Sequence, residues 1–310
     1  MAPGRQGFAQ TPVVRLIVPT AAQGSTDTIA RLLADGWTRR GIRGVVVENV
    51  VGRNGTQAAQ QVAASAPDGL TLLIATQNSH AIAPAFLAGV AYDPVRSFTP
   101  IIRFAAAPYV LVVKGSGPAS IGEFARQARA AQGGWRYAST GVLGPHHLIA
   151  LQYFRAAGLA LRHVPLAGGA VAIEQVVSGE VDVMLPAAVL ALPKIRSGQL
   201  RALAVSSGSR ASALPDVPTL RESGTPLVNE SWYGLMAPAG LAATKVQGLI
   251  DAVLAVLEDP LVRKAFLDLA IDSRSDTGSA FQDAIAAELA GWKQLAATIN
   301  LPHTPEEKSK

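Results

Sequence analysis

Cysteine is absent from this chain of 310 residues. Disulfides, a thiolate nucleophile, a zinc–thiolate site and a lipid-modified cysteine anchor are therefore excluded. The sequence also lacks any run of 18 apolar residues, so it predicts no membrane-spanning helix and no direct membrane insertion. Residues 1–10 lack the apolar core of a signal peptide. Taken alone, they indicate a cytoplasmic protein, or an export signal that has been removed or replaced.

A strong charge of one sign is also missing. The formal net charge is +5, which is small for a chain of this length, and the basic residues are scattered. The densest basic cluster, residues 39–43, has no neighbouring aromatic side chains that could stack on bases. We interpret this cluster as a solvated helix end, and the sequence predicts no nucleic-acid partner.

The common catalytic motifs are absent: GxxxxGK[ST], GxGxxG after a strand, HExxH and GxSxG. A hydrolase or lyase that uses Ser139 and His146, with Asp182 as a third member, stays an alternative, although the loop around Ser139 lacks elbow spacing. His146 and His147 are adjacent, so on a helix they point about 100° apart, and no carboxylate completes a metal-ligand set. The sequence therefore predicts a binding protein without enzymatic activity, metal or cofactor.

Apolar residues make up 49% of the chain, which is enough for a full core. Apolar runs typical of buried strands alternate with helical patterns as far as residue 205, and only helical patterns follow residue 238. We expect strands at residues 13–18, 45–47, 70–75, 109–113, 161–164, 181–185 and 200–205. Helices are expected between them, including 29–37, 55–64, 121–131 and 170–178.

Two alternating halves closed by a helical tail predict an α/β protein with two lobes, each a mainly parallel sheet flanked by helices. We assign residues 1–108 and 235–310 to the first lobe, which carries the C-terminal helices. Residues 109–234 form the second lobe. The chain is expected to cross between the lobes near residues 105–112 and 228–237, with a ligand cleft between them.

Two loops of small residues each join a buried strand to a helix. The first covers residues 19–25, and the second follows Ser139, with a helical pattern beginning at His146. The free N–H groups and the positive dipole end of a helix N-terminus bind anions without lysine or arginine. Two such loops facing each other across a cleft would hold a carboxylate. One of the two adjacent histidines is expected to face this cleft or cap the helix, and the other to lie on the surface.

The motifs around these loops resemble those of one family, the substrate-binding proteins of tripartite tricarboxylate transporters, also called the Bug family. They occur in the family's order from about residue 13 to 293, so the resemblance covers nearly the whole chain. The matching segments are 17–19, 24–27, 30–32, 47–49 with Gly52 and Gly55, 67–72, 92–95, 98–101, 137–141, 147–148, 163–165, 179–182, 198–205, 214–219, 231–234 and 237–240.

The resemblance implies a periplasmic-binding-protein-like fold of type II and a periplasmic, monomeric receptor. It would close about its hinge on a small organic carboxylate and deliver it to membrane subunits of a transporter. Asp27 and Asp182 are expected to brace loops. The residues implied to bind ligand, together with neighbours that the loop argument adds, are Thr20, Gln23, Gly24, Ser25, Thr26, Thr76, Gln77, Asn78, Ser79, Ser139, Thr140, Gly141, His146, Gly168, Gly169 and Ala170.

The sequence departs from the family where specificity is expected. Gln23 stands where glycine is usual in the first loop. Residues 165–168 and 185–188 carry apolar side chains where the family often has polar or charged ones. Because a buried unpaired charge costs several kcal/mol, these changes predict a ligand with an apolar aliphatic or aromatic body. A ligand-sensing module of the same fold is a further alternative.

Overall fold

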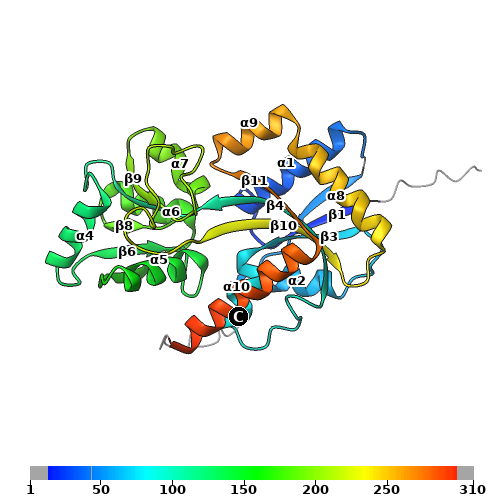
Figure 1. The fold of residues 1–310 in the computed structure, drawn as a ribbon, viewed down its shortest axis with the longest axis horizontal. Helices are drawn as coiled ribbons and strands as arrows, with labels where there is room; N and C mark the ends of the chain where they lie inside the picture. The colour runs from blue at the N-terminus through cyan, green and yellow to red at the C-terminus, as the bar shows by residue number, and fades with distance from the viewer. Residues whose placement is uncertain (1–12, 43, 299–310) are drawn as a thin grey trace, which may run out of the picture.

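The computed structural model describes residues 13–42 and 44–298, which form two lobes side by side, each a β-sheet flanked by helices (Figure 1). The segment at residues 1–10, on which the cytoplasmic or processed-signal interpretation depends, lies outside the described residues. In spatial order, the first sheet contains β11 (Asp272–Thr277), β4 (Phe98–Pro108), β10 (Glu230–Pro238), β3 (Thr71–Thr76), β1 (Val14–Val18) and β2 (Val45–Asn49). The second contains β7 (Arg162–Pro165), β6 (Arg136–Ser139), β8 (Val183–Met184), β5 (Val110–Lys114) and β9 (Leu200–Val205).

The helices lie between and after these strands. They are α1 (Ser25–Arg39), α2 (Thr56–Ala63), α3 (Ala83–Phe86), α4 (Ile121–Ala130), α5 (Pro145–Ala156), α6 (Gly169–Ser178), α7 (Ala188–Arg196), α8 (Ala243–Leu257), α9 (Pro260–Asp268) and α10 (Gly278–Thr298). A 3₁₀ turn, η1 (Arg53–Gly55), precedes α2, and a π-helical turn, η2 (Asn78–Ile82), follows β3. None of the helices in this described part of the chain is long and apolar enough to cross a bilayer.

Both sheets are mixed, whereas the strand–helix alternation predicted mainly parallel ones. β1 runs parallel to β2 and β3, but β10 runs antiparallel to β3 and β4. In the second sheet β6 is parallel to β7 and β8, while β5 is antiparallel to β8 and β9. In the first sheet β10 and β11 run against the direction of the βαβ strands, and in the second sheet β5 does so, which makes both sheets mixed.

The chain passes from the first sheet to the second at Tyr109, between the end of β4 and the start of β5, and returns in the segment between β9 and β10. The predicted lobe boundary after residue 234 falls inside β10, all of which pairs in the first sheet. The boundaries after residues 108 and 234 stay predictions.

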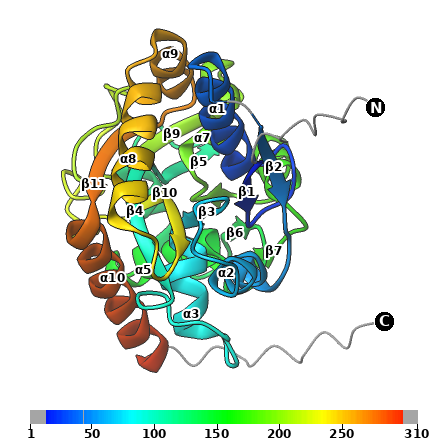
Figure 2. The same cartoon turned by 90° about the vertical axis from the view of Figure 1, so that its right-hand side faces the viewer.

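Helices cover both faces of the first sheet. Leu16 and Val18 of β1 pack in one core with α1, α8 and α9, whereas Ile17 packs on the opposite face with α2 and α10. This alternation follows from the two-residue period of a strand. Figure 2 shows α1 beside α8, and α2 on the other side of the sheet. The expected packing of the C-terminal helices on the first lobe is confirmed by these contacts.

Three strands were not predicted from the sequence: β4, β10 and β11. β11 has the sequence DSRSDT, which contains no apolar residue, and only helices were expected after residue 238. It pairs with β4, where Arg103 and Asp276 form an ion pair at 2.6 Å. β11 forms despite its weak strand propensity because it pairs with β4, so tertiary context decides its structure. A polar strand at the edge of a sheet also discourages pairing with other chains.

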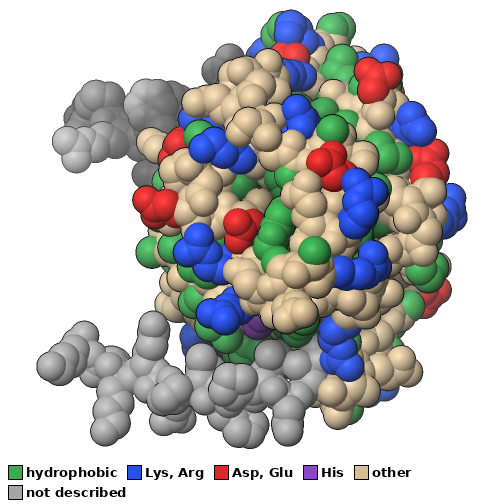
Figure 3. All heavy atoms as spheres, turned by 90° about the vertical axis from the view of Figure 1, so that its left-hand side faces the viewer, with side chains coloured by type: hydrophobic (Ala, Val, Ile, Leu, Met, Phe, Trp, Pro, Cys, Tyr) green, Lys and Arg blue, Asp and Glu red, His purple; other side chains and the backbone are tan. Residues whose placement is uncertain are grey.

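Acidic and basic side chains are interspersed on the end of the molecule formed by the second lobe (Figure 3). Among the described side chains of that face, no continuous basic patch is visible.

Candidate functional site

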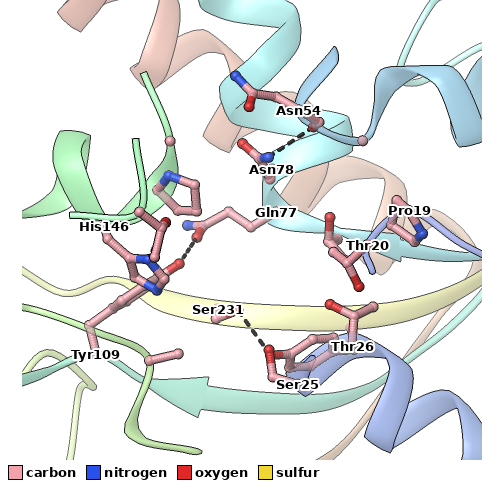
Figure 4. Close-up of a pocket in the computed structure, with 17 residues that line it drawn as sticks. Pro19, Thr20, Ser25, Thr26, Asn54, Gln77, Asn78, Tyr109, His146 and Ser231 are labelled. Carbon is pink, nitrogen blue, oxygen red and sulfur yellow. Dashed lines mark hydrogen bonds between the residues drawn. The ribbon is translucent and has the colours of Figure 1, made fainter. Parts of the chain in front are cut away.

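A cavity of about 230 Å³ lies between the two lobes. It opens among the ends of β1, β3 and β6 and the strands that cross between the lobes (Figure 4). Its walls come from the first lobe (Pro19, Thr20, Ser25, Thr26, Asn54, Gly55, Thr76, Gln77, Asn78), from the crossing segments (Tyr109, Ser231, Tyr233) and from the second lobe (Thr140, Gly144, Pro145, His146, Ala187).

The N-terminus of α1 faces this cavity through Ser25 and Thr26. Its N-cap residue, Gly24, has extended backbone angles and no side chain, so no side-chain oxygen caps the helix. The first N–H groups of a helix have no acceptor within the helix. The first predicted anion loop therefore places free donors and a positive dipole end against the cavity, as a carboxylate requires.

Asp27 holds this loop in place. Its side chain is 2% exposed and accepts hydrogen bonds of 2.9 Å from the Gln23 backbone N–H, from Arg31 Nε and from Asn49 Nδ2. Asn49 also donates to the Thr20 carbonyl at 2.9 Å. Burial by itself would raise the pKa of Asp27, but these donors outweigh it and hold the pKa below its ordinary value. The geometry agrees with the bracing role predicted for this carboxylate.

The second anion loop differs from the first in its supply of donors. Helix α5 begins at Pro145 rather than at His146, and proline has no backbone N–H. The His147 N–H donates to the Gly144 carbonyl at 3.1 Å. Thr140 Oγ1 lies 2.8 Å from His146 Nδ1, and both residues line the cavity. The second lobe therefore contributes mainly a hydroxyl and an imidazole.

Ser139 is not paired with His146, contrary to the arrangement that a hydrolase alternative needs. Its hydroxyl is buried and lies 2.6 Å from His163 Nε2, while Asp182 accepts from the Arg136 backbone N–H at 2.7 Å. Since Ser139, His146 and Asp182 have separate partners, no triad is assembled from them.

The two adjacent histidines lie differently from one another. His146 faces the cavity, as expected for one of the pair. The surface position expected for the other is wrong, because His147 is buried and stacks on His163 with ring centroids 3.9 Å apart. Among residues 13–42 and 44–298, no three His, Asp or Glu side chains gather as a set of metal ligands.

The segment after β3 contributes three predicted residues, Thr76, Gln77 and Asn78, to the cavity wall. Ser79 lies behind this wall, fully buried, with its hydroxyl 3.2 Å from Thr76 Oγ1. Asn78 Nδ2 donates to the Asn54 carbonyl at 2.8 Å, which fixes the orientation of its amide. Asn78 Oδ1 and Thr20 Oγ1 are buried without a hydrogen-bond partner among the described residues. A ligand or a water molecule in the cavity can supply the missing hydrogen bonds.

Half of the predicted site residues line the cavity: Thr20, Ser25, Thr26, Thr76, Gln77, Asn78, Thr140 and His146. The others lie outside its lining: Gln23, Gly24, Ser79, Ser139, Gly141, Gly168, Gly169 and Ala170. Gln23 is exposed, and its φ of +66° is a left-handed backbone conformation. A glycine at this position would adopt the same conformation without strain. Gly168 to Ala170 begin α6, which follows the edge strand β7. A ligand-binding role for each of the sixteen residues stays a prediction.

Sequence reasoning missed nine lining residues: Pro19, Asn54, Gly55, Tyr109, Gly144, Pro145, Ala187, Ser231 and Tyr233. The position of Tyr109, Ser231 and Tyr233 at the predicted crossings was the available signal, because segments that cross between two lobes necessarily pass the floor of the cleft.

The cavity wall is electrically neutral. None of its lining residues is Asp, Glu, Lys or Arg. Burial lowers the pKa of His146 to about 4, so its imidazole is uncharged at neutral pH, and burial raises the pKa values of Tyr109 and Tyr233. Backbone dipoles and hydroxyl or amide groups are therefore what the wall offers to a charged ligand.

The chain matches the family described as the tripartite tricarboxylate transporter family receptor over residues 29–301. It is 31% identical over 259 residues to a protein of Cupriavidus necator described as "UPF0065 protein in gbd 5'region", covering 83% of this chain and 78% of that one. It is 29% identical over 282 residues to BugT of Bordetella pertussis, covering 90% and 86%.

Solved structures agree with this match. One described as a periplasmic transporter superposes with a TM-score of 0.85 at 33% identity, covering 94% of this chain and 99% of that one. MatC from Rhodopseudomonas palustris with bound malate gives a TM-score of 0.80 at 30% identity, covering 92% and 98%. A further R. palustris protein with adipate gives 0.84 at 28% identity, covering 94% and 98%.

Two sheet–helix lobes with a cavity between them define a periplasmic-binding-protein fold, as predicted. The family match and the similarity over nearly the whole chain are more specific than the fold. The chain belongs to the tripartite tricarboxylate transporter receptor (TctC, or Bug) family of substrate-binding proteins. Its family and its similar structures are substrate-binding receptors.

Proposed function

We propose that this protein is a periplasmic receptor that captures a small organic carboxylate by hinge closure and delivers it to the membrane subunits of a tripartite transporter. The observation that carries the proposal is the uncapped N-terminus of α1 at a neutral cavity shared by both lobes. The malate and adipate bound to two similar proteins support the same ligand class.

Capture follows from the two-lobed geometry. A ligand that contacts Ser25 and Thr26 on one side and Thr140 and His146 on the other gains its full set of contacts only when the lobes are together. It favours the closed state by that difference in affinity. We keep the crossings near residues 105–112 and 228–237 as the hinge, and the boundaries after residues 108 and 234 as those of the lobes. We also propose that the receptor acts as a monomer.

The body of the ligand was predicted to be apolar from residues 165–168 and 185–188. Of these, Ala187 alone lines the cavity, and most lining side chains carry a hydroxyl, amide or imidazole. We therefore widen the proposed class to small carboxylates with polar or apolar bodies. A cavity of about 230 Å³ favours small acids over large ones.

A thermal-shift screen followed by calorimetry tests this function. The panel contains malate, succinate, citrate, adipate, glutamate and benzoate, with the methyl ester of each positive acid as its matched control. We expect at least one small acid to bind and its ester to bind far more weakly. Native mass spectrometry of freshly purified protein gives a second test through a co-purified acid. Binding of esters and acids with equal affinity would contradict a carboxylate receptor.

A further inference from the structure

Glu288 lies on α10, outside the cavity lining, in a half-buried polar network. It accepts hydrogen bonds from three N–H donors: Gln77 Nε2, Trp232 Nε1 at 2.6 Å and Trp292 Nε1 at 3.4 Å. Indole nitrogens and amide NH₂ groups only donate, so the carboxyl must accept through both oxygens. A proton on Glu288 would face one of these donors and break a bond. The ionised form is therefore the one that fits the network.

This carboxylate fixes the orientation of a residue in the cavity wall. The Gln77 side chain is 2% exposed, and its Nε2 donates both to Glu288 and to Asn229 Oδ1, the latter at 2.6 Å. Its Oε1 accepts from the Tyr109 hydroxyl at 2.8 Å, as Figure 4 shows. Turning the amide over would bring Oε1 against the Glu288 carboxylate, which is repulsive. With Glu288 ionised, Gln77 has one allowed orientation.

The same network reaches both crossing segments. Tyr109 lies between β4 and β5, and Asn229 directly precedes β10. Ser206 joins them, because its hydroxyl accepts from the Tyr109 N–H at 2.9 Å and donates to the Asn229 carbonyl. Gln77 thus bonds to the two segments about which the lobes are expected to move, and Glu288 holds Gln77.

We propose that ionised Glu288 is a positioning residue that sets the Gln77 amide in the cavity wall and ties the C-terminal helix to both crossing segments. The inference rests on the proposed function. Loss of the charge frees the Gln77 amide and loosens the arrangement that encloses the ligand. It is expected to weaken ligand binding about tenfold, the effect of one lost hydrogen bond to a charged group.

Titration of Glu288 is the measurable signature. Burial raises the pKa of Glu288, while the donors on Gln77, Trp232 and Trp292 and the charge of Arg103 act in the opposite direction. Besides Arg103, the titratable or charged groups on α10 and on the elements around it are Asp276, Asp272, Arg274, Glu230, His80, Tyr109, Tyr233, Asp283 and Lys293. Burial lowers the pKa of His80 to about 3 and raises that of Tyr109, so neither titrates between pH 5 and pH 8.

The test follows tryptophan fluorescence of the ligand-free protein from pH 4 to pH 8, because two indoles donate to Glu288. We expect a transition above the ordinary carboxyl range in the wild type and in D283N, a control that removes an exposed acid from the same helix. The transition should vanish in E288Q and persist in E288D. W292F, which removes one donor to the ionised form, should move it to higher pH. A transition that is absent from the wild type, or that persists in E288Q, would overturn the inference.

Affinity separates positioning from packing. Gln matches the volume of Glu, whereas Asp keeps its charge but is smaller. If Glu288 acts through packing, E288Q should bind the ligand more tightly than E288D. If Glu288 acts through its charge, E288D should bind the ligand more tightly than E288Q. The probes are malate and adipate, measured by calorimetry at pH 8. If neither binds the wild type, the proposed ligands fail, while the fluorescence titration still decides the role of Glu288. Equal affinity of E288Q and wild type for a bound probe would refute positioning.

Discussion

The substitution Asp27→Asn tests how the first anion loop is held. Asn has the shape of Asp, but its NH₂ group must face a donor whichever way the amide turns: Gln23 N–H and Arg31 Nε in one orientation, Asn49 Nδ2 in the other. The ion pair with Arg31 adds little, because the Arg31 side chain is 51% exposed and solvent screens the pair. A hydrogen bond to a charged acceptor, lost with its donor left unpaired, costs about 2 kcal/mol, so we expect the unfolding free energy to fall by about this amount at pH 7.

The dependence on pH gives this prediction its sign. The folded-state pKa of Asp27 lies below its ordinary value of 3.8, so ionisation favours the folded state. The stabilisation is fully present above the ordinary pKa and is lost as pH falls through the folded-state pKa. Urea unfolding followed by circular dichroism should therefore show a difference between wild type and D27N that shrinks as pH falls from 7 to 3.

The exposed Asp35 on the same helix gives the matched control, because D35N removes an equal charge without touching the loop. We expect D35N to change unfolding free energy by less than about 0.5 kcal/mol. D27N should also bind the identified acid more weakly, since the α1 N-terminus is no longer held against the cavity. A D27N protein as stable as wild type at pH 7, or a difference that does not depend on pH, would refute the reasoning.

Three further outcomes are expected. Gly36→Ala should lower the unfolding free energy measured with urea by about 1–3 kcal/mol, because the new Cβ would lie 2.5 Å from Val256. Gly248→Ala is the control: its Cβ meets nothing within 4 Å, so the substitution should raise the unfolding free energy by about 1 kcal/mol. Gln23→Gly relieves a left-handed backbone and should add about 0.5 kcal/mol while calorimetry shows unchanged ligand affinity; a large loss of affinity would instead place Gln23 at the ligand. The imidazole of His146, whose pKa burial lowers to about 4, should stay neutral from pH 8 down to pH 5 in nitrogen-detected NMR, and protonation near pH 6.5 would contradict its burial.

The fold class and the position of the cavity were accessible from the sequence because they depend on local patterns. Apolar runs, the helical periods and the two small-residue loops specify strands, helices and strand-to-helix turns, and those turns meet at the cavity. The order of motifs added the family. Sheet direction was not accessible, since pairing of β10 with β3 and β4 joins segments more than 120 residues apart.

The remainder of the site depends on tertiary packing. Pro145 at the first position of α5 removes a donor that the loop pattern seemed to offer, and no pattern showed that Ser139 would pair with His163. Glu288 lies far along the chain from Gln77, so their contact is invisible without the fold. A polar strand such as β11 likewise forms because β4 needs a partner.

The central claim is that the N-terminus of α1 holds a carboxylate in a cavity closed by both lobes. A crystal structure of the protein saturated with the tightest-binding acid tests it most directly. The account predicts carboxylate oxygens within hydrogen-bond distance of the Ser25 and Thr26 backbone N–H groups, with Thr140 or His146 contacting the same ligand from the opposite lobe. A carboxylate bound away from α1, or held by one lobe alone, would contradict it.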